Sequence, residues 1–412
     1  MQHFRRTISR VTAPALVAII LCISAPPAGA QTFRVLHSFT GGSDGATPFG
    51  GLTLDRAGNI YGTASAGGYT GNNCTSAGCG TVFKLTNRNG AWILTPLYAF
   101  RGSDDGANPY AGVTIGANGT LYGTTLQGGT GAGTVFNLSP PARATGNITG
   151  GWTETMIYRF GLPPDGQLPA YGKLVFDSAG DLYGTTFEGG APCYDAACGT
   201  VFKLTPLSGG GWTKTDYDFT GQSDGSNPLS GVVIDAAGNL YGTTSNANVA
   251  PVVYRLLPSA SGWTETTLYT LEFFDDPRGG VVLDGSGGLY GGTVSNLVYQ
   301  LTPAAGQWNY TLLYTFTGFS GVWSPLIRDA SGNLYGVTCG DGASSQGTAF
   351  KLTPTGSGWS ETDLYEFTGH SDGGCPVGGA VLDANGNLYG TTAYGGAGCG
   401  STGCGVLWEI TP

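Results

Sequence analysis

Residues 386–412 read GNLYGTTAYGGAGCGSTGCGVLWEITP and stop where other copies of the same phrase continue. Six earlier copies run on through a tryptophan into a further segment, such as GWSETDLYEFTGHSDG at residues 358–373. The position of the segment missing from the last copy decides the architecture of the chain.

The phrase Leu-Tyr-Gly recurs seven times at intervals of 45 to 61 residues, with Ile60 in place of Leu in the first copy. Around each copy an apolar run such as GLTLD precedes a turn, and a Gly-rich loop separates IYGT from TVFKLT. A last run begins with Trp and ends in a phrase such as LYAF. Short runs rich in β-branched and aromatic residues between Gly, Asn, Asp or Pro indicate β-strands. Four strands per unit of roughly 40–50 residues predict the blades of a β-propeller.

The missing segment lies at the other end of the chain. Leu36-His37-Ser38-Phe39 aligns with Leu97-Tyr98-Ala99-Phe100. Phe100 comes eight residues after Trp92, and Phe39 comes eight residues after Gln31. We therefore expect the strand that begins at Gln31 to complete the seventh blade beside VLWEIT. The prediction is an all-β, seven-bladed propeller of four antiparallel strands per blade, closed by its N-terminal strand, and closure removes free sheet edges.

Residues 1–30 are predicted to be a signal peptide, with the propeller over 31–412. The segment has a basic start, the apolar run ALVAIILCIS and a small-residue cleavage site at Ala28-Gly29-Ala30. An uncleaved anchor is the alternative. Because the chain ends at Pro412 without a hydrophobic tail, a secreted, periplasmic or cell-surface monomer without membrane insertion is expected.

Composition argues against nucleic acid as a partner. The chain has 17 Lys and Arg against 27 Asp and Glu, and residues 1–30 contain three of the Arg and no acid, which leaves a net charge of −13. Nucleic acids and anionic membranes need clustered positive charge. No phosphate-binding or dinucleotide motif is present and only three His occur, so no cofactor and no metal is predicted.

Most conspicuous residues are assigned to the scaffold. The fourth-strand tryptophans and the Leu-Tyr-Gly tyrosines are expected to pack between blades. Aspartates that precede the hairpin turns are expected to accept hydrogen bonds from the turn backbone. These turn aspartates are Asp55, Asp177, Asp235, Asp284, Asp329 and Asp383.

Eight cysteines outside the first 30 residues suggest disulfides in an exported chain. Three pairs fall in the loop between second and third strands, so local bridges are predicted: Cys74 with Cys79, Cys193 with Cys198, and Cys399 with Cys404. A bridge from Cys339 to Cys375 is predicted to join blades six and seven. A zinc site with four Cys ligands is the alternative.

Two sets of loops share one face of the predicted propeller, and variable loops on a rigid scaffold are where binding residues usually lie. The candidate ligand-binding residues on this face are Asp44, Asp105, Asp165, Asp224, Asp372, Tyr110, Tyr171 and Trp323, with Tyr69, Tyr194 and Tyr394 as further off-pattern aromatics. Aromatic rings beside hydrogen-bonding acids suit sugars. The alternative is that each Asp-Gly is simply a turn and each aromatic covers a loop.

The repeated wording GLTLDRAGNIYGT, GTVFKLT and LYAFRGSDDGANP resembles the GloVer-type tandem repeats of exported bacterial proteins over residues 31–412. The phrase VVIDAAGNLYGT is similar to NHL-type propeller repeats. The resemblance implies a surface or secreted propeller and brings no catalytic residues, and propellers host unrelated functions.

Three functions remain open on the sequence. The first is a non-catalytic binding or scaffolding module for polysaccharide or an extracellular protein. The second is a carbohydrate-active hydrolase or lyase that uses Glu188, Asp195 or Asp341. The third is a purely structural unit. An enzyme is the less favoured reading, with no catalytic residue assigned.

Overall fold

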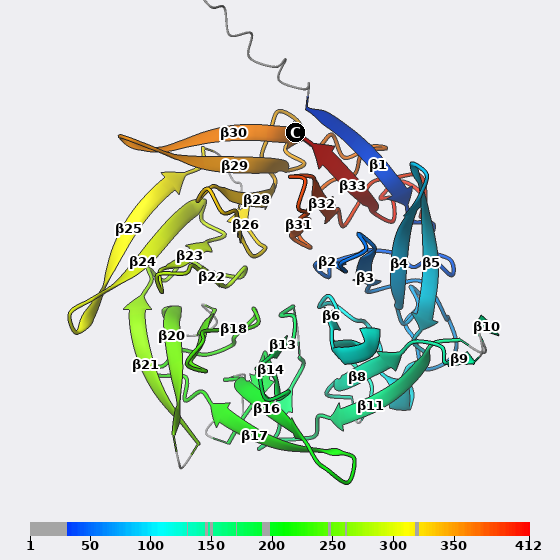
Figure 1. Ribbon diagram of the computed structural model, residues 1–412, viewed down its shortest axis with the longest axis horizontal. Coiled ribbons are helices and arrows are strands. Elements are labelled where there is room, and N and C mark those ends of the chain that lie inside the picture. The colour runs from blue at the N-terminus through cyan, green and yellow to red at the C-terminus, as the bar shows by residue number, and fades with distance from the viewer. Residues whose placement is uncertain are drawn as a thin grey trace, which may run out of the picture. The chain divides into compact units, whose positions relative to one another are not determined.

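Seven antiparallel sheets, six of four strands and one of five, form a ring in the computed structural model (Figure 1). The structure describes residues 31–412 except 130, 145–146, 149–150, 170, 192–197, 246–248, 260–261 and 318–320. The predicted seven-bladed propeller is therefore confirmed. The predicted signal peptide lies outside the described residues.

Each blade runs from a short inner strand to a long outer strand. Blades one to three contain β2 (Thr53–Leu54), β3 (Ile60–Ala64), β4 (Thr81–Arg88) and β5 (Ala91–Ala99); β6 (Thr114–Ile115), β7 (Leu121–Thr125), β8 (Thr134–Ser139) and β11 (Thr153–Arg159); and β13 (Val175–Phe176), β14 (Leu182–Thr186), β16 (Thr200–Pro206) and β17 (Trp212–Asp218). Blades four and five contain β18 (Val233–Ile234), β19 (Leu240–Thr243), β20 (Val252–Ser259) and β21 (Gly262–Thr270); and β22 (Val281–Leu283), β23 (Leu289–Gly292), β24 (Leu297–Ala304) and β25 (Gln307–Thr315).

Blade six contains β27 (Ile327–Arg328), β28 (Leu334–Cys339), β29 (Thr348–Thr355) and β30 (Gly358–Glu366), and β26 (Gly321–Val322) also pairs with β28. Blade seven contains β31 (Ala380–Leu382), β32 (Leu388–Thr391), β33 (Val406–Thr411) and, as its outer strand, β1 (Thr32–Ser38). The loops carry small elements: η1 (Ser103–Asp105), η2 (Ala117–Gly119), β9 (Arg143–Ala144), β10 (Asn147–Ile148), β12 (Gly166–Gln167) and β15 (Glu188–Gly189).

The ring closes through β1 and β33, as the repeat alignment predicts. The two strands are antiparallel, with Val35 opposite Trp408, and the Phe39 amide donates to the Gly405 carbonyl at 3.1 Å. Phe33 on β1 also stacks on Tyr365 of blade six, with ring centroids 3.6 Å apart. The N-terminal strand therefore completes one sheet and packs against its neighbour.

The Leu-Tyr-Gly phrase packs in the same way in every blade. A Cβ on Gly62 would lie 2.6 Å from the Phe83 ring of the adjacent third strand, so only glycine leaves room for that ring. The same close approach occurs at Gly123 with Phe136, Gly184 with Phe202, Gly242 with Tyr254, Gly291 with Tyr299, Gly336 with Phe350 and Gly390 with Trp408. Trp408, which replaces the usual Phe, is thus a scaffold residue.

The turn aspartates act as predicted. The Asp55 carboxylate accepts hydrogen bonds from the Ala57 and Asn59 amides, both at 2.9 Å, and from the Tyr61 hydroxyl at 3.2 Å. Burial raises the pKa of Asp55, but these bonds outweigh it and hold that pKa below its usual value. The hairpin turn and the second-strand tyrosine are therefore fixed by one carboxylate.

The core lies between blades as seven clusters of buried side chains, each drawn from two adjacent sheets. Fourth-strand tryptophans join these clusters; Trp92 of blade one meets Tyr389 of blade seven edge-on, with centroids 5.8 Å apart. The predicted inter-blade role of these aromatics is confirmed.

A belt of threonine hydroxyls joins blades near the axis. Thr63 donates to the Ala111 carbonyl of the next blade at 2.8 Å. Thr185, Thr243 and Thr391 do the same toward Ser230, Pro277 and Pro48. The equivalent residues of blades five and six are Gly292 and Val337, so this hydroxyl is missing both between blades five and six and between blades six and seven.

Disulfides pin the loops of one face. The structure joins Cys74 to Cys79 and Cys399 to Cys404 within loops, with Cα atoms 5.0 and 5.2 Å apart. Cys339 and Cys375, with Cα atoms 4.3 Å apart, join blade six to blade seven as predicted. Cys198 is also disulfide-bonded, whereas Cys193, its predicted partner, lies outside the described residues.

These bridges indicate an oxidising environment of the extracellular type. In the part of the chain that the structure describes, no helix has the length and apolar character needed to span a membrane.

Candidate functional site

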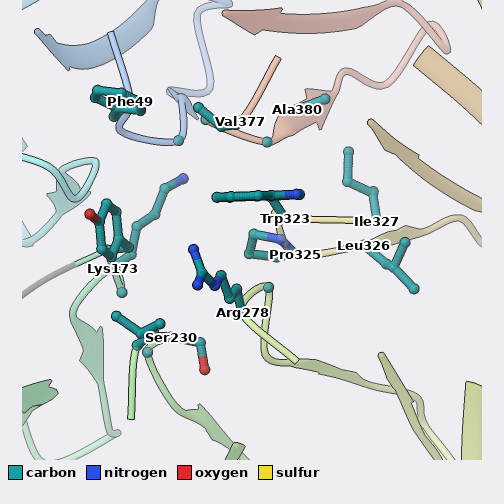
Figure 2. Close-up of a pocket in the computed structure, with 18 of the residues that line it drawn as sticks. Phe49, Lys173, Ser230, Arg278, Trp323, Pro325, Leu326, Ile327, Val377 and Ala380 are labelled. Carbon is teal, nitrogen blue, oxygen red and sulfur yellow. The ribbon is translucent and has the colours of Figure 1, made fainter. Parts of the chain in front are cut away.

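The centre of one propeller face is hollowed into a cavity of about 500 Å³, which we call the axial pocket (Figure 2). Its lining comes from the segments that lead into the first strands of six blades, from the first residue of four of those strands, and from Tyr394, in the last loop between second and third strands. This is the face that carries both sets of variable loops, which we call the loop face.

One register of the repeat supplies the mouth of this pocket. In five blades it is the residue directly after a proline, as in Pro48-Phe49 and Pro277-Arg278. We call the seven residues at this register the mouth ring: Phe49, Tyr110, Tyr171, Leu229, Arg278, Trp323 and Val377. All except Tyr110 line the axial pocket.

Three aromatic members of the mouth ring, from blades one to three, form a continuous surface. Tyr110 lies between Phe49 and Tyr171, with ring centroids 5.3 Å from each. Burial raises the pKa of Tyr110, and the neighbouring hydroxyls of Tyr171 and Tyr394 raise it further. Phe49 and Tyr110 also line a second cavity of about 310 Å³, the side groove, so apolar surface extends outward from the axis.

Two cationic side chains line the axial pocket, Lys173 and Arg278; the Arg278 nitrogens face its interior, and the Lys173 side chain extends toward blade one (Figure 2). Burial lowers the pKa of Lys173 to about 8. The Arg278 guanidinium lies 4.6 Å from the centroid of the Trp323 indole and bonds the buried Asp276 carboxylate through Nε at 2.8 Å. No carboxylate belongs to the lining among the described residues.

The predicted aspartates lie elsewhere and are engaged within their own loops. Asp372 accepts bonds from the Thr368 amide at 2.8 Å and from the Tyr365 hydroxyl at 3.1 Å. Asp224, Asp105, Asp165 and Asp44 are bonded in the same way, with His37 replacing the tyrosine at Asp44. None of the five lines the axial pocket or the side groove.

The predicted aromatics divide differently. Tyr171, Trp323 and Tyr394 are brought together around the axial pocket, and Tyr110 lines the side groove. Tyr69 is 48% exposed but lines neither cavity, and Tyr194 lies outside the described residues.

Of the acids named for a hydrolase, the two described ones, Glu188 and Asp341, do not line the axial pocket. Glu188 belongs to β15 in blade three, and the Asp341 carboxylate accepts a bond from the Gly342 amide in blade six. Asp195 lies outside the described residues. Within the described ranges no three His, Cys, Asp or Glu side chains are grouped to hold a metal ion.

Sequence reasoning missed Phe49, Lys173 and Arg278. Aligning the repeats backward from the turn aspartates would have found them, because it places Arg278 in register with the aromatics. The same alignment places Lys173 at a position that holds Gly or Pro in every other blade: Gly51, Gly112, Gly231, Gly280, Pro325 and Gly379.

The fold and the site together define a β-propeller with disulfide-pinned loops and an aromatic, cationic pocket on its axis. The chain belongs to the Gloeobacter/Verrucomicrobia repeat family, whose model matches residues 23–170, 72–297 and 248–412. No curated protein matches it.

Solved structures similar to the chain include a protein from Thermus thermophilus, provisionally assigned as an oxidoreductase (glucose dehydrogenase), at 13% identity and a TM-score of 0.44. That match covers 92% of this chain and 99% of the other. A gluconolactonase from Xanthomonas campestris matches at 13% identity and a TM-score of 0.42, covering 93% of this chain and 90% of its own. At these values neither match informs the activity of this chain.

Proposed function

We propose that this protein is a non-catalytic binding module that takes a saccharide in the axial pocket. The observation that carries the proposal is the set of exposed aromatics around one cavity of about 500 Å³. Trp323, Tyr171 and Tyr394 keep 39%, 49% and 47% of their surface exposed, and all three line this cavity from blades six, three and seven. Exposed aromatics gathered at a concave site are typical of ligand recognition.

A saccharide fits this lining better than a purely apolar ligand. A sugar ring has an apolar face that stacks on an aromatic ring and a polar edge that needs hydrogen bonds. Tyrosine hydroxyls and the backbone of Gly51, Gly231 and Gly378, which also line the pocket, supply donors and acceptors. The side groove shares Phe49 with the pocket, so a chain of sugars could occupy both.

Binding is preferred to glycoside cleavage because of the charges present. Glycosidases need a pair of carboxyl groups across the bond that breaks. The described lining of the axial pocket contains Lys173 and Arg278 instead.

The site of action in this proposal is outside the cytoplasm. Residues 1–30 act as the signal peptide, and the remaining chain works as a secreted or envelope-associated monomer. The support is the basic and apolar pattern of that segment together with the disulfides, which form in oxidising compartments.

A polysaccharide array tests the proposal with the chain from Gln31 to Pro412. The wild-type chain is expected to be retained on at least one glycan, and the double variant Trp323→Ala/Tyr110→Ala is expected to lose that retention. Phe274→Ala is the matched control, because Phe274 is 78% exposed and lies outside both cavities. Circular dichroism checks that all three chains fold.

Equal retention of the double variant would remove the axial pocket as the binding site. Retention on no glycan, with self-association or capture of a purified extracellular protein instead, would support the scaffolding role and reject the saccharide.

A further inference from the structure

Lys173 breaks the repeat at the register two residues after the mouth ring, and it lines the axial pocket. Every other blade has Gly or Pro at this register, so only blade three sends a long side chain from it into the axial pocket. The structure leaves room for it, since a Cβ on Gly112 would lie 2.8 Å from Lys173 Cε and one on Gly51 would lie 3.0 Å away. The lysine of blade three therefore reaches past blade two to blade one.

The Lys173 ammonium has neutral partners only. Nζ donates to the Leu52 carbonyl and to the Thr53 hydroxyl, the latter at 3.2 Å. An ammonium group has three N–H donors, so one remains. No carboxylate pairs with Lys173 among the described residues. A half-buried cation without a counter-ion is costly unless an anion binds beside it.

Arg278 presents a second set of donors to the same cavity. Its Nε is taken by Asp276, while its two terminal nitrogens have no hydrogen-bond partner within the described part of the chain. Its side chain is 39% exposed. Because a guanidinium offers parallel N–H donors, it matches a carboxylate with two bonds.

The pocket thus has a positive interior in a chain of net charge −10. Asp276 balances one of the two cations, and Lys173 remains unbalanced. A cation held against the overall charge of the protein favours an anionic ligand over a neutral one.

We propose that the axial pocket selects a sugar that carries a carboxylate, a uronate, whose carboxylate lies between Lys173 and Arg278 while its ring contacts Trp323. This inference rests on the proposed function and narrows it to one class of saccharide.

The test compares tri-galacturonic acid with its methyl ester, which keeps the rings and removes the charges. Isothermal titration against the chain from Gln31 to Pro412 is expected to show the acid binding at least roughly tenfold more tightly, as charged hydrogen bonds imply. Lys173→Met and Arg278→Gln are each expected to reduce acid affinity to that of the ester. Arg88→Gln, the same loss of charge at an exposed hairpin residue away from the pocket, is expected to change neither.

The outcomes separate the two proposals. Equal affinity for acid and ester would overturn the uronate assignment and leave saccharide binding intact. A sulfated trisaccharide that binds more tightly than the acid would overturn the carboxylate in favour of another anion. Failure of the acid, the ester and every array glycan to bind would reject both proposals.

Discussion

At the scale of single residues, the repeated carboxylates of the loop face hold loops in place. Asp224 and Asp372 are 6% and 7% exposed, and each accepts bonds from a threonine and from the tyrosine seven positions earlier. These aspartates recur in the sequence because the same loop in several blades needs a carboxylate to hold it. A ligand site on one axis does not require such repetition.

Asp372→Ala should lower stability and leave ligand binding unchanged. The substitution leaves the Thr368 amide and the Tyr365 hydroxyl without an acceptor, which costs about 1–3 kcal/mol in the free energy of unfolding. Tyr365→Phe, which removes one of these bonds, should cost less. Urea denaturation measures both, and a loss of glycan retention by folded Asp372→Ala would contradict this structural role.

The Lys173 side chain should give stability a pH dependence. Its pKa of about 8 in the folded chain lies below the usual value of about 10.4, so the unfolded chain binds more protons between these values. The free energy of unfolding of the wild type should therefore rise relative to Lys173→Met from pH 8 to pH 10. The gain between pH 8 and pH 10 is about 2 kcal/mol, because at pH 8 the folded chain is still about half protonated at Lys173.

Urea titrations of both chains at pH 7, 8, 9 and 10 measure this difference, and groups common to both chains cancel. A difference that stays constant across the range would show that Lys173 keeps an ordinary pKa in the folded state.

At the scale of strands, β1 is the element on which the ring depends. It covers β33, whose Trp408 is fully buried, and its Phe33 packs on blade six. Without β1, blade seven has three strands and an unpaired edge, which is a template for association.

A chain that begins at Phe39 should be less stable than one that begins at Gln31, by on the order of 5 kcal/mol, from exposure of the apolar surface that β1 covers. It should also self-associate in light scattering. A peptide of residues 31–39 added in trans should restore a monomer, whereas the same peptide with Phe33→Asn should not. A monomeric truncated chain of unchanged stability would refute the role of β1.

Between blades six and seven, a disulfide stands where the threonine belt is interrupted. Val337 supplies no hydroxyl to that interface. Cys339, two residues after Val337, forms the disulfide with Cys375 of blade seven. This interface therefore has a covalent link and no threonine hydrogen bond, whereas the interface between blades five and six, with Gly292 at the same register, has neither among the described residues.

Removing this bridge should destabilise the protein more than removing a loop bridge. Cys339 and Cys375 are 36 residues apart, whereas Cys74 and Cys79 are 5 apart. The chain-entropy relation gives roughly 4 kcal/mol for the first and roughly 2 kcal/mol for the second. Urea midpoints of Cys339→Ala/Cys375→Ala and Cys74→Ala/Cys79→Ala measure the difference, and equal midpoints would argue against this ranking.

At the scale of the whole molecule, the fold could be predicted from the sequence because each blade repeats the same physical requirements. The glycine under the third-strand aromatic and the aspartate in the hairpin turn recur, so their spacing reveals both strand order and blade number. Ring closure followed from one alignment, Leu36 to Phe39 with Leu97 to Phe100.

The site could be predicted only in part, because it consists of departures from the repeat. Trp323 and Tyr171 attract notice as aromatics outside the pattern. Lys173 and Arg278 do not attract notice, because a single cation in a long chain forms no recognisable motif. They become conspicuous only when the closed ring places both in the lining of the axial pocket. Their convergence depends on the closed ring, which no local stretch of sequence contains.

The antiparallel closure also determines how the molecule responds to mechanical load. Thr32 lies opposite Thr411, so both ends of the described ring leave blade seven at the same corner. Tension applied between these ends pulls the β1–β33 rungs apart one after another, as a zipper opens, instead of loading them together in shear. A load applied between the two ends therefore acts first on the strand pair that closes the ring.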